Sequence, residues 1–161
     1  MRAFRNVTVS VWIACVLVVL FAGSAAANVV PFKGSAVGQD VSVTFEEAGI
    51  HIVAQARGTG TGLGRFVETL DYILSYDFVN FAGSATITAA DGSEIFLDFE
   101  GTIPGFAGQV FPLPYSGTFT ITGGTGRFDT VGGAGTIDGI DYGAGLFSLG
   151  FSGYRLLGDG K

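Results

Sequence analysis

The chain has 161 residues, a formal net charge of −6 at pH 7 and 27 glycines. Its excess of acidic residues argues against nucleic acids and anionic membrane surfaces as partners, because both are bound through basic patches. Disorder is also disfavoured, since the glycines separate runs rich in Ile, Val, Phe and Thr that can bury a core.

Residues 1–27 have the pattern of a secretory signal peptide. Two arginines precede an apolar run over 11–21, and alanines fill 25–27, where a signal peptidase accepts small residues. We therefore expect an exported protein, secreted or periplasmic, whose mature chain begins at Asn28 and contains no membrane span. A retained membrane anchor is the alternative, but the apolar run is short for a bilayer span of roughly 20 residues.

Cleavage would remove Cys15, the only cysteine, so the exported chain cannot form a disulfide. Six basic and 14 acidic residues would remain, which gives a formal charge of −8. Roughly 130 residues are enough for one domain with a single core. Within it we expect a lead-in over 28–40, a β-domain over 41–157 and a C-terminal tail over 158–161.

The chain after residue 27 predicts about eight strands. They are expected over 41–45, 50–57, 66–78, 84–89, 94–103, 115–122, 134–140 and 145–156. Gly, Asp or Pro separates these alternating runs, and none has a helical period, so the fold class is all-β, a sandwich or a barrel. Asp91 and Gly92 predict a two-residue hairpin with a type I′ turn, which needs positive φ at both positions.

Alternation also predicts which faces of the strands are apolar. In 70–78, the apolar face carries Leu70, Tyr72 and Leu74. In 94–100, Asp98 and Glu100 share an acidic face that either meets solvent or lines a polar lumen. The solvent-exposed arrangement is favoured, because a carboxylate that faces a closed core is costly unless it is paired.

The sequence offers few catalytic or metal-binding residues. His51 is the only histidine, and without Cys15 neither a zinc site nor a Cys-His nucleophile can be assembled. His51 shares a predicted strand face with Arg57, which favours a surface position. Asp138 and Asp141 are a weak calcium candidate, because no full loop of oxygen ligands is visible. We expect no metal and no cofactor.

Two glycine turns, over 62–66 and 123–128, both end in Arg-Phe. Glycine permits the positive φ of a tight turn, arginine can bond exposed carbonyls or an acidic neighbour, and phenylalanine can re-enter the core. We therefore predict structural roles for Gly62, Gly64, Arg65, Phe66, Gly123, Gly124, Gly126, Arg127 and Phe128. Phosphate binding is the alternative, but neither turn has a P-loop pattern or a following helix.

The second turn, within 119–128, is followed by a glycine-rich run over 131–136. Together they resemble the glycine turn of the allene oxide cyclase and dirigent proteins of plants and their bacterial relatives. The runs 58–66 and 83–92 look like the corresponding parts of exported bacterial members. The resemblance implies a calycin-like barrel of eight antiparallel strands, with a lumen that holds a small hydrophobic molecule in the plant enzymes. It also implies a homo-oligomer, usually a trimer.

Six aromatic residues on alternating strands are candidates for lining such a lumen. They are Tyr72, Tyr76, Phe96, Tyr115, Phe147 and Tyr154. The alternative is that these rings only fill a small barrel, because eight strands leave an interior that side chains can nearly close.

Three functional hypotheses follow. The first is a non-catalytic barrel that binds a small apolar molecule or acts as an interaction module, and it requires a preformed cavity. The second is a cofactor-free isomerase or cyclase of the family type. It needs an acid facing that cavity near an Arg or Tyr, and the candidates are Asp71, Asp77, Asp98 and Glu100. The third is a structural protein whose lumen is closed.

Overall fold

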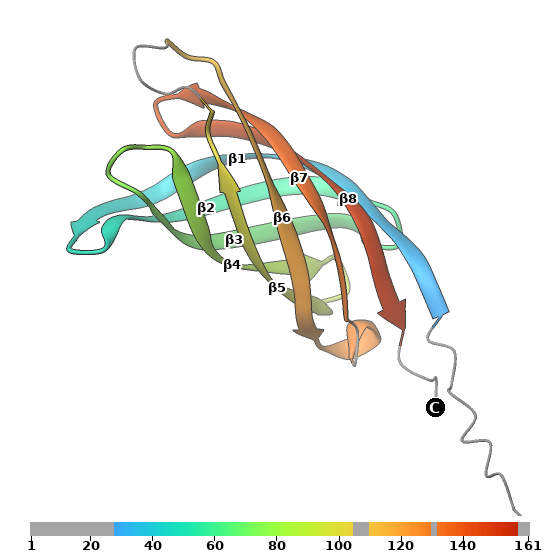
Figure 1. The fold of residues 1–161 in the computed structure, drawn as a ribbon. Helices are drawn as coiled ribbons and strands as arrows, with labels where there is room; N and C mark the ends of the chain where they lie inside the picture. Colours follow the sequence, from blue (N-terminus) through green and yellow to red (C-terminus); the bar gives the residue numbers. More distant parts are fainter. Residues whose placement is uncertain (1–27, 105–109, 130–131, 158–161) are drawn as a thin grey trace, which may run out of the picture.

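The chain forms one closed β-barrel in the computed structural model, which describes residues 28–104, 110–129 and 132–157. Its strands are β1 (Asn28–Glu46), β2 (Gly49–Gly60), β3 (Gly64–Leu74), β4 (Asn80–Ala89), β5 (Glu94–Thr102), β6 (Leu113–Gly124), β7 (Gly132–Gly143) and β8 (Leu146–Leu157). Consecutive strands pair antiparallel, and β1 pairs with β8 to close the barrel (Figure 1). The prediction of an all-β barrel with eight antiparallel strands is confirmed. The predicted signal peptide and the tail over 158–161 lie outside the described residues.

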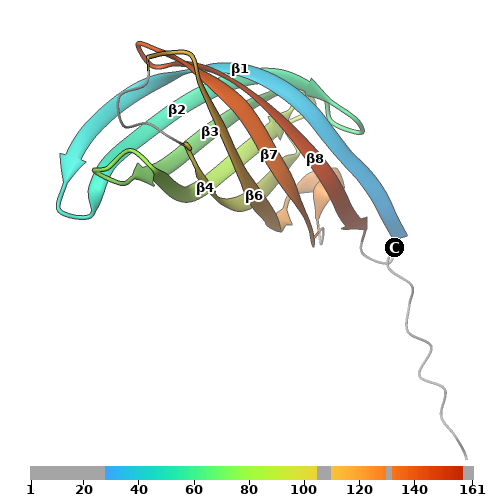
Figure 2. The same cartoon turned by 45° about the horizontal axis from the view of Figure 1, so that its top comes forward.

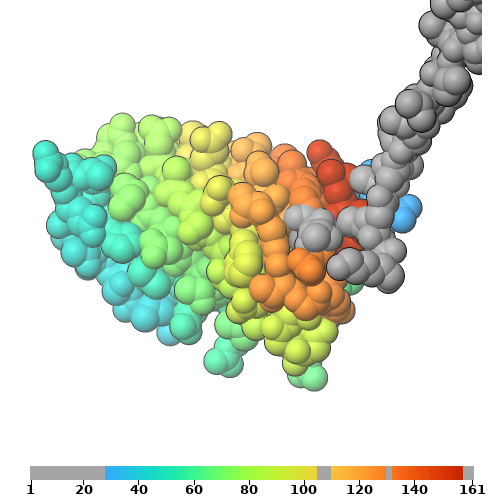
Figure 3. All heavy atoms as spheres, turned by 90° about the horizontal axis from the view of Figure 1, so that it is seen from below, coloured from blue at the N-terminus to red at the C-terminus, as the bar shows by residue number. Residues whose placement is uncertain are grey.

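The connections between strands alternate between the two ends of the barrel (Figures 1 and 2). The β1–β2, β3–β4, β5–β6 and β7–β8 connections share one end, which we call the open end. The β2–β3, β4–β5 and β6–β7 connections share the other, which we call the closed end. Because each strand neighbours the next one in sequence, the colours follow one another in order across the molecular surface (Figure 3).

In the part of the chain that the structure describes, the only helical segment is the 3-10 turn η1 (Gly126–Phe128). No helix within these described ranges has the length and apolarity that a membrane crossing requires.

The first strand is longer than the sequence predicts. It begins at Asn28, so residues 28–40, expected as a lead-in, form part of the barrel wall and pair with β8. Phe32 and Ala36 are buried on its inner face. Gly34 and Gly38 occupy two further inner positions and hide the apolar alternation, because glycine carries no side chain that marks a buried face.

Several inward-facing glycines lie directly opposite an aromatic residue of a neighbouring strand, and at five of them the ring lies across the glycine. The pairs are Gly34 with Phe151, Gly38 with Phe147, Gly101 with Phe81, Gly135 with Phe119 and Gly139 with Tyr115. At each glycine a Cβ atom would lie 2.3–2.6 Å from an atom of the partner ring. Glycine therefore leaves room for a ring to lie across the neighbouring strand, which explains why so many glycines occur inside strands.

Gly34→Ala tests this arrangement. It is expected to lower the free energy of unfolding by about 1–3 kcal/mol, because the added methyl group overlaps the Phe151 ring and the Thr59 carbonyl oxygen. Urea unfolding measures the change. Gly123→Ala is the matched control, since its nearest contact would be a Phe96 carbon at 3.9 Å. Equal losses at the two positions would contradict the steric explanation.

Strand β3 ends earlier than predicted, at Leu74 rather than at residue 78. The backbone N–H of Ser75 donates to the Asn80 carbonyl, and the Asn80 N–H donates to the Ser75 hydroxyl. Phe78, between them, has a positive φ of 57°. These contacts make residues 75–79 a turn. The strand therefore ends at Leu74, although the alternation of apolar and polar residues in the sequence continues to residue 78.

The hairpin between β4 and β5 is present, but the predicted type I′ turn is wrong. Gly92 has a φ of 81°, whereas Asp91 is not among the residues with positive φ. The Gly92 N–H donates to the Ala89 carbonyl, and the Ala89 N–H donates to the Ser93 carbonyl. This is a three-residue loop in which only the last residue is left-handed, a common hairpin geometry.

Aromatic rings fill the lumen toward the closed end. Phe32 and Phe151 stack with ring centroids 4.8 Å apart, and Phe119 packs edge-on against Phe32 at 5.6 Å. Phe32 is fully buried. These three side chains also line the space at the open end and form its floor.

The two glycine turns meet at the closed end. Arg127 donates from Nη2 to the Leu63 carbonyl oxygen at 3.0 Å, and its Nε lies 3.0 Å from the Asp91 carboxylate. It thus joins the second glycine turn to the first and to the β4–β5 hairpin. Phe128 is fully buried, and the guanidinium groups of Arg127 and Arg155 lie 4.6 and 5.1 Å from its ring centroid.

The other residues of the two turns divide into two groups. Gly62, Gly64 and Gly126 have positive φ, as a tight turn requires, and Phe66 is buried. Gly123 and Gly124 belong to β6 and have no positive φ, and Arg65 is exposed at the start of β3. The sequence therefore identified the turns correctly but not the role of each glycine in them.

Candidate functional site

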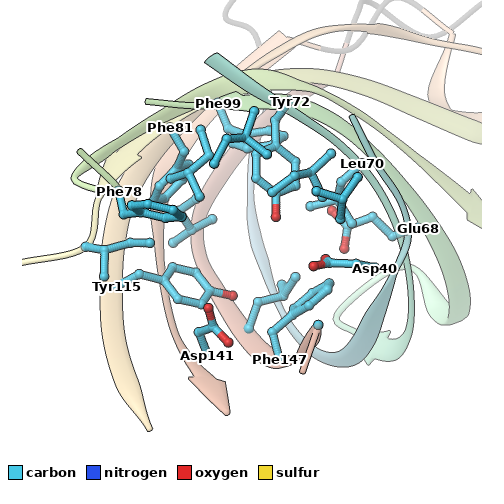
Figure 4. A pocket seen from close by; sticks show the side chains of 18 of the residues that line it. Asp40, Glu68, Leu70, Tyr72, Phe78, Phe81, Phe99, Tyr115, Asp141 and Phe147 are labelled. Atoms are coloured by element: carbon cyan, nitrogen blue, oxygen red, sulfur yellow. The ribbon is translucent and has the colours of Figure 1, made fainter. Parts of the chain in front are cut away.

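A cavity of about 320 Å³ occupies the lumen at the open end of the barrel (Figure 4). All eight strands contribute to its wall, which is mainly apolar and aromatic. Every connection of the open end contributes to the rim, through residues that include Phe45, Phe78, Phe111 and Ala144. A cavity of this size and composition can hold a small organic molecule.

A β-bulge in β1 shapes the mouth of this cavity. The register between β1 and β2 shifts between Asp40 and Ser42, so Val41 is the extra residue. Such a bulge reverses which residues of a strand face inward. Asp40 faces the lumen before the bulge, and Val43 and Phe45 face it afterwards.

Half of the predicted aromatic candidates line the cavity. Tyr72, Tyr115 and Phe147 point into it from β3, β6 and β8 (Figure 4). The Tyr115 hydroxyl donates to the Ser148 carbonyl oxygen at 2.9 Å. Burial raises the pKa of both tyrosines above the ordinary value, so both remain protonated donors at neutral pH.

The other three candidates lie outside the lumen, and their prediction as lining residues is wrong. Tyr76 lies in the β3–β4 turn, half exposed, and its hydroxyl donates to the Glu46 carbonyl. Phe96 belongs to the outer face of β5, since its neighbours Ile95 and Leu97 are the buried ones. Tyr154 lies on the outer face of β8 with 44% of its surface exposed.

Two carboxyl groups flank Phe147 at the mouth. Phe147 pairs with Gly38 of β1, two residues before Asp40, and with Asp141 of β7. Partial burial and the neighbouring Asp141 charge raise the pKa of Asp40 to about 6. The Asp141 carboxylate accepts a hydrogen bond of 2.7 Å from the Gly143 N–H, which fixes its orientation.

A third carboxyl group, Glu68, projects into the lumen from β3 (Figure 4). It is only 4% exposed, and no described residue forms a hydrogen bond with its Oε2 atom. Burial raises the pKa of Glu68 from 4.5 to about 7. Burial therefore favours the neutral, proton-donating form of Glu68.

The four acids predicted as lumen candidates all lie on the outside. Asp71, Asp77, Asp98 and Glu100 are exposed. His51 also lies on the outer face, as predicted, where Nδ1 lies 3.1 Å from Glu46 and Nε2 lies 2.7 Å from Asp71. The hydrogen bond with Asp71 is the main cause of the raised pKa of His51.

Sequence reasoning missed all three acids that face the lumen. Glu68 stands two residues from Phe66 and two from Leu70 on the same strand face, so the alternation already placed it inside. Asp40 belongs to residues 28–40, for which the sequence predicts a lead-in rather than a strand. Whether Asp141 faces inward can be decided only when the pairing of β7 is known. Asp138, its predicted calcium partner, is exposed on the opposite face of the strand.

The described lining residues include five ionisable groups, three acids and two tyrosines, and no Lys, Arg or His. Among the described residues, no three His, Cys, Asp or Glu side chains converge as metal ligands would. The site can therefore bind an apolar molecule and can donate or accept protons through carboxyl and phenol groups.

The comparisons agree with a dirigent-like barrel. No family model and no curated protein matches the chain. Among solved structures, the barrel is similar to the pterocarpan synthase dirigent protein GePTS1, with a TM-score of 0.53 and 14% sequence identity over 83% of this chain and 86% of that chain. The likeness supports a dirigent-like fold. The allene oxide cyclase part of the resemblance stays a prediction.

Proposed function

We propose that the protein is exported and binds a small, largely apolar molecule in the lumen of its barrel. The observation that carries this proposal is the cavity of about 320 Å³ at the open end, preformed and lined mainly by apolar and aromatic side chains. Such a cavity is what the first hypothesis requires, and it argues against a structural protein with a closed lumen. A homo-oligomer, implied by the family resemblance, belongs to the same proposal and is checked by the native mass.

A second candidate function is a cofactor-free isomerase or cyclase that acts in the lumen. The observation that favours it is the set of carboxyl groups around the cavity, with Asp40 and Glu68 titrating near neutral pH. A carboxyl group with such a pKa can donate a proton in one step and accept it in another. Turnover of a bound molecule, rather than its release unchanged, would separate this candidate from simple binding.

Val43→Trp tests the binding proposal at the mouth of the cavity. Val43 lines the cavity at the open end and is 50% exposed, so a larger ring there is expected to obstruct entry without disturbing the core. We expect the affinity for the neutral fluorescent probe N-phenylnaphthylamine to fall at least about tenfold. Val67→Trp, at an exposed site of β3 outside the cavity, is the matched control. A probe that binds all three proteins equally would show that it does not use the lumen.

A further inference from the structure

The charge of the lumen is one-sided. Its described lining contains Asp40 from β1, Glu68 and Tyr72 from β3, Tyr115 from β6 and Asp141 from β7, and no basic side chain. A ligand that carries a carboxylate would bring a fourth acidic group among these three without a cation to pair with it. Ligands of that kind are therefore disfavoured.

Glu68 provides a separate reason to expect a positively charged partner. A buried carboxyl oxygen without a hydrogen bond destabilises a folded protein, and native proteins pair most such groups. Oε2 of Glu68 has no hydrogen-bond partner among the described residues, and the side chain is only 4% exposed and points into the cavity (Figure 4). A donor supplied by a ligand in the lumen would satisfy it.

We propose that the preferred ligand of the lumen is an apolar molecule that carries a cationic amine, held through its ammonium group by Glu68. This inference rests on the proposed binding function and adds the chemical class of the ligand. An ammonium group has three donors and a full charge, and its hydrogen bonds to carboxylates are stronger than those of a neutral hydroxyl. Asp40 and Asp141, nearer the mouth, add to the attraction for a cation on its way in.

Three naphthalene probes of nearly equal size separate the ligand classes. They are the amine naphthylethylamine, the alcohol naphthylethanol and the carboxylate of naphthylacetic acid. Calorimetric titration of the protein purified from its own host, near pH 8, is expected to give the tightest binding for the amine, about tenfold or more tighter than the alcohol, with the acid weakest. Lowering the pH to about 5 protonates Asp40 and Glu68, so the preference for the amine over the alcohol is expected to shrink.

Glu68→Gln assigns the preference to this residue. It is expected to weaken amine binding about tenfold and to change alcohol binding less than about twofold. Glu100→Gln, an exposed carboxyl on the outer face of β5, should change neither affinity. Equal binding of amine and alcohol, or an amine preference that survives Glu68→Gln, overturns this inference and leaves the binding proposal intact. Binding of none of the probes overturns both.

Discussion

Glu68→Gln is expected to stabilise the protein by about 3 kcal/mol near pH 8, in the absence of ligand. Each pKa unit corresponds to about 1.4 kcal/mol, and burial raises the pKa of Glu68 from 4.5 to about 7. Above pH 7 the wild-type protein must therefore keep an ionised carboxylate in an apolar environment. Glutamine has the same shape and carries no charge.

The sign of the pH dependence follows from the raised pKa. The folded protein holds the Glu68 proton more tightly than the unfolded chain, so its contribution to stability is fully present below about pH 4.5 and is lost as the pH rises through about 7. The difference between Glu68→Gln and wild type should shrink to about 1 kcal/mol or less near pH 5. Urea unfolding at both pH values measures it.

The control for this prediction is Glu100→Gln, which removes an equal charge from the exposed face of β5. It should leave the pH dependence of unfolding close to that of the wild type. A Glu68→Gln protein that unfolds with the same pH dependence as the wild type would show that Glu68 is paired or hydrated in solution. It would then also weaken the inference about an amine ligand.

Phe128→Ala is expected to lower the free energy of unfolding by about 3–5 kcal/mol, the usual cost of removing a fully buried phenylalanine. The ring also lies against the guanidinium groups of Arg127 and Arg155, and each such contact at a partly exposed site contributes about 0.5–1 kcal/mol. The loss should be large because Phe128 packs where the two glycine turns meet. Urea unfolding of the variant measures it.

Phe45→Ala is the matched control at the opposite end of the barrel. Its ring is 72% exposed at the rim of the cavity, so its removal should change stability by less than about 0.5 kcal/mol. Phe128→Leu should fall between the two, because it keeps most of the buried apolar volume. Similar losses for Phe128→Ala and Phe45→Ala would mean that the closed end does not hold the barrel together.

Several elements were predictable because their signals are local. The alternation in β3 and β5, the hairpin near Gly92 and the buried Phe66 and Phe128 follow from neighbouring residues. The predicted bounds of β1 and β3 were wrong, because alternation of apolar and polar residues does not by itself mark where a strand begins and ends. Glycines that face rings on another strand concealed most of β1, and turn contacts of Ser75 ended β3 while the alternation continued.

The lumen was less predictable than the strands, although part of its signal was present. Tyr72, Tyr115 and Phe147 were recognised, and Glu68 was recognisable from its alternation with Phe66. Tyr154 was assigned to the wrong face, because the inward face of β8 depends on its pairing with β1 and β7. An aromatic residue on an alternating strand does not by itself reveal which face of that strand points into the lumen.

The residue patterns alone were enough to predict an all-β chain of about eight antiparallel strands and the positions of two glycine turns, because those properties depend on residues within one strand or turn. How the acidic groups of the lumen come together, by contrast, depends on the tertiary structure. Closure of the barrel brings Asp40 of β1 and Asp141 of β7 to either side of Phe147, and the bulge after Asp40 sets which residues face inward. The acidity of Asp40 and Glu68 likewise depends on their burial inside the closed barrel, which no run of neighbouring residues specifies.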